Sequence, residues 1–274
     1  MLGQFKKFLF PFFISFVLGI FPSFSNTISA RAEGGIIHDN CLERCPSGSP
    51  EDNILVDHGV IFLSSNPTTK FADWVAYKTL PSYITGAEKH SRNWAQDPKI
   101  DAQFTFTPQD YAGMSKEPYL FDRGHQAPLG SFKNHPKWYV VNYLSNITPQ
   151  KKFLNQGPWN NLEAAERKLL AKYEATYTLT GPYYDKNQSV EGPSIERFEY
   201  VVPSGYWKII SVKEGNQIKT AHFIFPQNVA FKDDYCSFLA TAPSIEQLTH
   251  LKFHVPEGLS LRKELGCEAN VAMQ

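Results

Sequence analysis

The sequence predicts an α+β fold, in which a single domain holds a central, mainly antiparallel β-sheet flanked by helices. Short runs rich in β-branched and aromatic residues recur along the chain and are bounded by Pro, Gly or Asn. These runs cover residues 60–63, 74–77, 138–147, 176–180, 198–202, 206–212 and 221–225. Because few helical segments separate them, an antiparallel or mixed sheet is favoured over a doubly wound parallel one.

Two segments have helical character. Within residues 157–173, Pro158 occupies a first-turn position and apolar side chains recur at helical spacing, at Trp159, Leu162, Leu169, Leu170 and Tyr173. A second helix is predicted over residues 245–251, with Ser244 as its N-cap. No composition shift marks an internal boundary, so residues 33–274 are expected to form one domain.

The first 32 residues have the pattern of a signal peptide. Lys6 and Lys7 precede an apolar run of 13 residues over 8–20, and Ala30-Arg31-Ala32 matches an A-x-A cleavage site. The alternative is a transmembrane anchor, but that requires roughly 20 apolar residues. Cleavage before Glu33 would give a secreted or periplasmic protein with no membrane association in its mature form.

Composition supports a packed core and argues against binding by bulk charge. The chain is 42% hydrophobic and 14% aromatic, which is ample for a folded domain. Loss of Lys6, Lys7 and Arg31 would leave 24 basic residues against 27 acidic ones, a net charge of −3. A protein that holds nucleic acid by overall charge would be basic. A nuclease needs only a local cationic site, so that class stays open.

Four cysteines behind an export signal predict two disulfides. They are Cys41, Cys45, Cys236 and Cys267, and three pairings are possible. Proximity in sequence favours pairing Cys41 with Cys45 and Cys236 with Cys267. A zinc site is the alternative, but no second Cys or His pair stands at zinc-finger spacing.

The run from Tyr119 to Pro128 is the first candidate for chemistry. If Arg123 and His125 lie on an extended strand, both side chains point to one face, and Gly124 between them would let an anionic group approach. This arrangement pairs a base with a cation. The alternative is an ion pair between Asp122 and Arg123 beside a surface histidine.

An amide-rich stretch follows and contains Asn142, Asn146, Gln150 and Asn155. Amide side chains are poor strand formers, so their number suggests a functional reason. Structural alternatives are that Asn155 caps a helix, that Asn146 ends a strand, or that Asn146-Ile-Thr accepts a glycan.

Glu163 and Arg167 are four residues apart and would meet on one helix face, where a surface ion pair is the alternative interpretation. Asn155 would lie roughly 12 Å from Glu163 along a straight helix. Direct binding of one ion by both is therefore not expected. A magnesium ion commonly keeps several waters, so Asn155 could bind it directly while Glu163 holds a bound water.

Together these residues resemble the DNA/RNA non-specific endonucleases of the ββα-metal, or His-Me finger, superfamily, in particular its secreted bacterial Serratia-type members. The resemblance covers nearly the whole mature chain except residues 185–196 and the tail after Cys267. It rests on the Cys41-x-x-x-Cys45 segment, residues 69–77, Arg92-Asn-Trp, Asp122-Arg-Gly-His-Gln-Ala-Pro-Leu, Asn142-Tyr-Leu-Ser-Asn-Ile-Thr-Pro-Gln, Leu154-Asn-Gln-Gly-Pro-Trp, Leu162-Glu, Glu166-Arg-Lys-Leu, Thr180-Gly-Pro and Tyr206-Trp-Lys.

The resemblance implies a role for each candidate residue. His125 would be the general base, Asn155 the direct protein ligand of one Mg²⁺ ion, with Mn²⁺ as an alternative ion, and Glu163 the holder of a metal-bound water. Arg92 would stabilise the transition state. The resemblance implies supporting roles for the other polar residues, namely Arg123, Asn146, Arg167, Asn142, Gln150 and Asp122. It also supports the local disulfide pairing.

The expected activity is hydrolysis of DNA and RNA to 5′-phosphorylated products, through contacts with the phosphate backbone. A homodimer is an oligomeric state that the resemblance allows. Two other functions fit the same residues. One is a phosphodiesterase for small nucleotides, and the other is an exported binding module that has lost catalysis.

Overall fold

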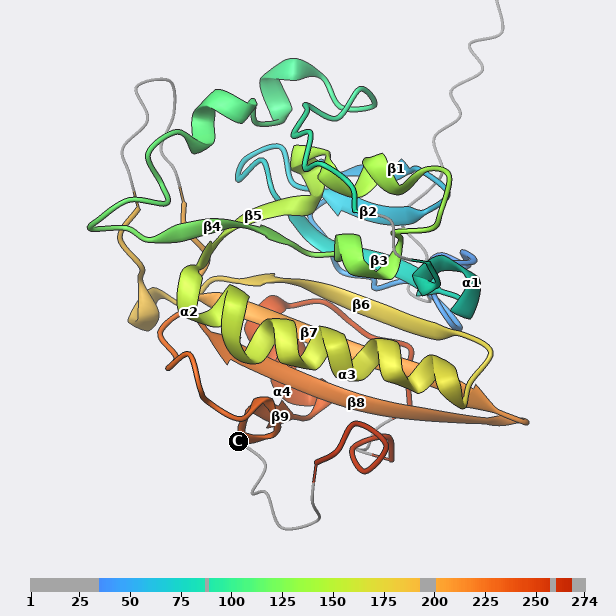
Figure 1. Cartoon of the computed structure of the whole chain (residues 1–274). Helices are drawn as coiled ribbons and strands as arrows, with labels where there is room; N and C mark the ends of the chain where they lie inside the picture. The colour runs from blue at the N-terminus through green and yellow to red at the C-terminus, as the bar shows by residue number, and fades with distance from the viewer. Residues whose placement is uncertain (1–34, 87–88, 193–200, 257–259, 268–274) are drawn as a thin grey trace, which may run out of the picture.

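A computed structural model describes residues 35–86, 89–192, 201–256 and 260–267 (Figure 1). The expected signal peptide lies outside these residues. The main sheet has seven strands in the order β1-β2-β3-β6-β7-β8-β9, and every neighbouring pair is antiparallel. The strands are β1 (Ile54–Asp57), β2 (Ile61–Ser65), β3 (Ala72–Thr79), β6 (Thr176–Tyr183), β7 (Gly205–Glu214), β8 (Gln217–Pro226) and β9 (Leu239–Ala240). The predicted α+β class and the strands expected near residues 60, 74, 176, 206 and 221 are therefore confirmed.

The strand expected over residues 138–147 is wrong. The chain there forms two 3₁₀ turns, Trp138–Asn142 and Leu144–Asn146, and only its last residue enters a strand. The amide of Asn146 donates to the carbonyl oxygens of Ala127 (3.0 Å) and Val141 (2.8 Å), so backbone groups gain side-chain partners in place of a sheet ladder. In the run 198–202, residues 198–200 lie outside the described part, and Val201 and Val202 form no strand.

A second, two-stranded sheet stands apart from the first. Strand β4 (Phe121–His125) pairs antiparallel with β5 (Ile147–Lys151), so that His125 lies opposite Ile147. The chain then passes through α2 (Lys152–Leu154) and a π turn (Asn155–Trp159) into α3 (Asn160–Lys168). Two strands and a helix thus form a ββα unit, whose helix α3 lies across β7 and β8 (Figure 1).

Helix α3 is shorter than the sequence predicts because Gly157 breaks it. Gly157 has φ −101° and ψ −116°, which are not helical values, and its backbone lies against the carbonyl of Phe231. A side chain at position 157 would place its Cβ 2.5 Å from that oxygen. The helix ends in a 3₁₀ turn, Leu169–Ala171.

The core lies on both faces of the main sheet. Helix α3 covers one face of β6–β8, where Trp159 and Leu162 pack with Tyr206, Ile210 and Phe223 (Figure 1). The alternate residues of β7 face the other way, toward α4 (Ala242–Thr249). A short helix, α1 (Pro81–Ile84), follows β3.

The N-cap expected for the C-terminal helix is wrong by three residues. Helix α4 begins at Ala242, and the Thr241 side chain accepts a hydrogen bond from the Ser244 backbone N–H at 3.3 Å. Pro243 fits the first turn because its missing N–H would have no helical partner there. Within the described residues, no helix is both long and apolar enough to cross a membrane.

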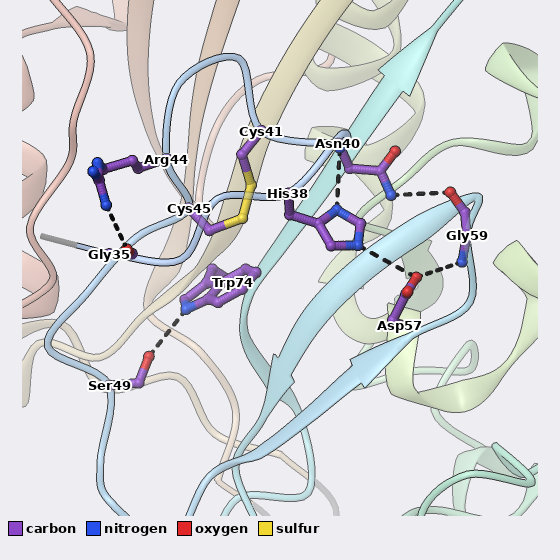
Figure 2. The surroundings of a disulfide bond; sticks show 10 residues. All are labelled: Gly35, His38, Asn40, Cys41, Arg44, Cys45, Ser49, Asp57, Gly59 and Trp74. Carbon is purple, nitrogen blue, oxygen red and sulfur yellow. Dashed lines mark hydrogen bonds and ion pairs between the residues drawn. A yellow bond between two sulfur atoms is a disulfide. The ribbon is translucent and has the colours of Figure 1, made fainter. Parts of the chain in front are cut away.

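Both disulfides form with the local pairing that the sequence favours. Cys41 bonds to Cys45, and Cys236 bonds to Cys267. Figure 2 shows the first disulfide above the ring of Trp74, in a segment tied down by polar contacts. The Arg44 guanidinium donates to the Gly35 carbonyl (3.1 Å), and the Asn40 amide donates to the Gly59 carbonyl (3.1 Å). The segment thus attaches to the β1–β2 turn through Asn40.

Candidate active site

A cleft of about 710 Å³, the main cleft, opens beside the ββα unit. Three elements and a loop supply its polar side chains: β4, the π turn, α3 and the loop before residue 94. Seven of the residues singled out from the sequence line it: Arg92, Asp122, Arg123, His125, Asn155, Glu163 and Arg167. Residues up to 75 positions apart in sequence therefore meet around one space.

Strand β4 places Arg123 and His125 on one face, as its period of two predicts. The ring of Trp94 lies against both, with its centroid 5.6 Å from Cζ of Arg123 and 5.1 Å from the imidazole centroid. Arg123 also lies over the ring of Tyr111 at 5.5 Å and donates to the Pro108 carbonyl at 3.0 Å. Its cationic head is held by aromatic faces, not by an ion pair with Asp122.

The sequence suggested that Gly124 lets an anionic group approach. In the structure the Gln150 side chain occupies the space beside this glycine instead. A Cβ at this position would lie 2.5 Å from Oε1 and 2.6 Å from Cβ of Gln150. Gly124 is therefore needed because the Gln150 side chain lies against β4 at this position.

His125 is a neutral imidazole at ordinary pH. Burial is the main cause that lowers its pKa from 6.5 to about 4; the Asn142 hydrogen bond opposes this change, and the positive charge of Arg92 adds a smaller lowering effect. Its Nε2 lies 3.0 Å from Oδ1 of Asn142. An amide oxygen can only accept, so this bond places the ring proton on Nε2 and leaves the lone pair on Nδ1.

Most of the amide side chains of this stretch are buried behind the main cleft. Asn142, Asn146 and Gln150 are fully buried and do not line it. Asn146 braces the chain after β4, since its Oδ1 also accepts from the Ala127 N–H at 2.9 Å. Neither polar atom of the Gln150 amide has a hydrogen-bond partner among the described residues. Of the four amides, only Asn155 reaches the space where chemistry could occur.

Asn155 is held by a carboxylate and is not the N-cap of α3. Its Nδ2 donates to Oδ2 of Asp122 at 2.8 Å, and Gln156 donates to the same oxygen at 2.8 Å. Helix α3 starts after Trp159 and has no side-chain cap. Because Gly157 breaks the helix between them, the straight-helix estimate for Asn155 and Glu163 does not apply, and both line the main cleft.

Glu163 lies in the buried wall of the main cleft. Desolvation raises its pKa, while the charges of Lys208 and Arg167 act in the opposite direction. Lys208 is fully buried in β7, with its ammonium 4.4 Å from the centroid of the Trp159 ring and 3.7 Å from Oε2 of Glu166. The sequence did not identify Lys208, because a lysine within a strand ordinarily points to solvent.

The donor set beside Asn155 suits a hard divalent cation. Hydrogen bonding of Nδ2 to Asp122 leaves the amide oxygen of Asn155 for another partner, and the carboxylates of Asp122 and Glu163 line the same space. Among the described residues there is no cluster of three or more His, Cys, Asp or Glu side chains that could hold a metal. Oxygen ligands supplemented by water are typical of Mg²⁺ and unlike a zinc site.

Comparisons with known proteins point to one family. Residues 43–257 match the family model for DNA/RNA non-specific endonucleases. The chain is 41% identical to a nuclease of Serratia marcescens over 216 residues, which is 78% of this chain and 79% of that protein. It is 30% identical over 207 residues to the mitochondrial endonuclease G of Homo sapiens, covering 70% of this chain and 66% of that protein.

A solved structure shows the same fold. A chain in the crystal structure of the EndoG/EndoGI complex superposes with a TM-score of 0.62 at 25% identity, covering 73% of this chain and 84% of that one. The resemblance noted from the sequence is thereby confirmed. The chain belongs to the DNA/RNA non-specific endonuclease family and is a metal-dependent endonuclease.

Proposed function

We propose that this protein is an exported, sugar-non-specific endonuclease that hydrolyses phosphodiester bonds in DNA and RNA to 5′-phosphorylated products, with His125 as general base and Mg²⁺ as cofactor. One observation carries the proposal. A neutral imidazole and an oxygen-rich group of side chains around Asn155 line the same cleft, beside the guanidinium groups of Arg92, Arg123 and Arg167.

His125 takes a proton from the attacking water. Its Nδ1 carries the lone pair because Nε2 is bonded to Asn142, and its lowered pKa keeps the ring neutral at pH 7. The Asn142 bond also fixes the ring orientation and stabilises the imidazolium that forms. A positioned general base of this kind typically contributes 10²–10⁴-fold in rate.

Asn155 would hold the Mg²⁺ ion directly, and Glu163 would hold a water bound to it; Mn²⁺ is an alternative ion. When bound, the ion neutralises charge on the phosphoryl oxygens and on the leaving oxygen. Asp122 orients the Asn155 amide through the bond at 2.8 Å. The carboxylate thus acts through Asn155, as outer-shell partners of metal ligands commonly do.

The arginines bind phosphate oxygens. Arg92 is exposed and stabilises the negative charge that develops on the phosphoryl group in the transition state. Arg123 and Arg167 are half-buried and line the same cleft. Asn142, Asn146 and Gln150 support this arrangement from behind. Backbone contacts carry no sequence information directly, and the proposed attack does not use the ribose 2′-hydroxyl. Both features favour action on DNA as well as RNA.

Export places the protein outside the cytoplasm. We propose that residues 1–32 are removed as a signal peptide and that residues 33–274 form the mature endonuclease, secreted or periplasmic and without membrane association. The two disulfides support an oxidising compartment. N-terminal sequencing of exported protein tests the cleavage site, and sedimentation distinguishes a monomer from a homodimer.

Digestion of plasmid DNA and of RNA, with Mg²⁺ and with chelator, tests the activity. We expect both to be cleaved internally only with the ion, giving 5′ ends that accept a phosphate label only after phosphatase treatment. Cleavage confined to a mononucleotide diester would instead identify a small-molecule phosphodiesterase. Binding of nucleic acid in Mg²⁺ without cleavage would identify a binding module.

A further inference from the structure

A second hollow, the side groove, adjoins the main cleft. It measures about 510 Å³ and is lined by α1 and its following residue, by Lys133, and by the end of α3 with the turn after it. Gly130 and Arg167 line both hollows. The side groove therefore continues the main cleft past Arg167, toward the C-terminal end of α3.

The side groove is lined by cationic side chains and by no carboxylate. Lys133, Arg167 and Lys168 line it, and its lining contains no Asp or Glu. None of the three forms an ion pair with a described residue. By contrast Lys172, one turn further along, lies 3.2 Å from Glu214 and 3.7 Å from Glu264.

Gly130 fits the junction between the two hollows. A Cβ at this position would lie 3.2 Å from both Cζ and Nη1 of Arg167, so any side chain would press against the guanidinium. With glycine there, the Arg167 head can lie against the backbone and remain open to both hollows. One guanidinium can then contact two successive phosphates, since it presents five donors in a planar fork.

We propose that the side groove binds a backbone phosphate of the substrate strand next to the scissile phosphate, with Lys133 and Lys168 as its ligands and Arg167 between the two phosphates. The inference rests on the proposed endonuclease activity and adds the path of the strand. Apolar side chains of Pro81, Ile84 and Leu170 form the remaining wall, against which a sugar can pack. An anion is the complementary ligand, and continuity with the main cleft makes the substrate strand its source.

Salt dependence of binding tests this path without catalysis. Wild type, K133Q/K168Q and the control K213Q/K263Q each bind a fluorescent single-stranded oligonucleotide in chelator over a series of salt concentrations. Lys213 and Lys263 are exposed and line neither hollow, so the control removes the same charge elsewhere. Each phosphate contact on a single strand contributes about 0.7 to the slope of log K against log salt. K133Q/K168Q removes one phosphate contact and should therefore lose about 0.7 in slope, and the control should match wild type.

A second readout uses substrate length. In wild type, kcat/KM should rise from a dinucleotide with one phosphate to a hexanucleotide, because only the longer strand reaches the side groove. The ratio of kcat/KM for the hexanucleotide to kcat/KM for the dinucleotide should fall in K133Q/K168Q and stay at the wild-type value in the control. If the double variant fails to fold, K133Q and K168Q alone should each lose a measurable part of the loss of about 0.7 expected for this phosphate, and K213Q and K263Q alone should not.

Three results would overturn the proposal. The first is a slope in K133Q/K168Q equal to that of wild type, and the second is an equal loss of slope in the control K213Q/K263Q. The third is a loss of slope in K133Q/K168Q that accompanies dissociation of an oligomer on sedimentation. The last would assign the side groove to a second copy of the chain. Because binding is measured in chelator, failure of the proposed cleavage would appear separately, as wild type that binds the strand but leaves plasmid intact in Mg²⁺.

Discussion

The ring of His125 is bonded through Nε2 to the amide oxygen of Asn142, at 3.0 Å, across the ββα unit. His125 ends β4, and Asn142 ends a 3₁₀ turn that precedes β5. The bond therefore makes the protonation site of the ring depend on a residue 17 positions away in sequence. The remaining nitrogen, Nδ1, is the atom on which the proposed chemistry depends.

Replacing His125 with Ala should lower the rate by at least about two orders of magnitude, because the water then lacks its base. Single-turnover cleavage of plasmid at saturating Mg²⁺ measures the loss. An unchanged melting temperature shows that folding is intact. Turnover close to that of wild type would remove His125 from its proposed role.

Asn142→Asp should move the acid limb of the pH–rate profile to higher pH. In the native protein the pKa of His125 is about 4, so the ring loses its function as a base only well below pH 6.5. A carboxylate beside Nε2–H would favour the imidazolium and raise that pKa. The profile of kcat/KM from pH 4 to 8 measures the shift, and a limb at the same pH in both proteins would contradict the assigned contact.

Asn155→Ala should raise the Mg²⁺ concentration needed for activity, because the direct protein ligand is lost. Asp122→Ala should raise it less, by about 10–100-fold, since the Asn155 amide loses the acceptor that orients it. Calorimetric titration of Mg²⁺ into each variant measures its affinity for the ion without turnover. Identical titrations of wild type and Asn155→Ala would exclude direct binding.

His222 should make the fold sensitive to acid. It is buried in β8, neither ring nitrogen has a partner among the described residues, and burial lowers its pKa from 6.5 to about 4. The unfolded chain therefore binds a proton at a higher pH than the folded one. The free energy of unfolding is therefore unaffected by His222 above pH 6.5. It decreases as the pH falls from 6.5 to about 4, and below pH 4 this residue causes no further change.

His222→Phe should flatten this pH dependence. The difference in unfolding free energy between pH 7 and pH 4 should shrink by about 3 kcal/mol, since one pKa unit corresponds to about 1.4 kcal/mol. Urea denaturation at both pH values measures it. His125 also has a lowered pKa and remains in the variant, so some dependence should persist; an unaltered difference would mean that His222 does not contribute.

Several features could be predicted because they depend on residues close in the chain. Alternation along β4 placed Arg123 and His125 on one face, and helical spacing identified Trp159 and Leu162 as buried. Sequence proximity favoured the correct cysteine pairs. Where local signals competed, prediction failed. The β-branched residues around Val140 suggested a strand, but the Asn146 side chain satisfies the backbone there and the chain turns instead.

The sequence by itself determined the strand and helix periods, the cysteine chemistry and the order of polar motifs that marks the family. Only the tertiary structure decided how the site is assembled. The break at Gly157 brings Asn155 and Glu163 to one cleft, Gln150 fills the space over Gly124, and Trp94 packs against both Arg123 and His125. The physical reason is that backbone periodicity acts over a few residues, whereas burial and charge depend on partners that folding brings from distant parts of the chain.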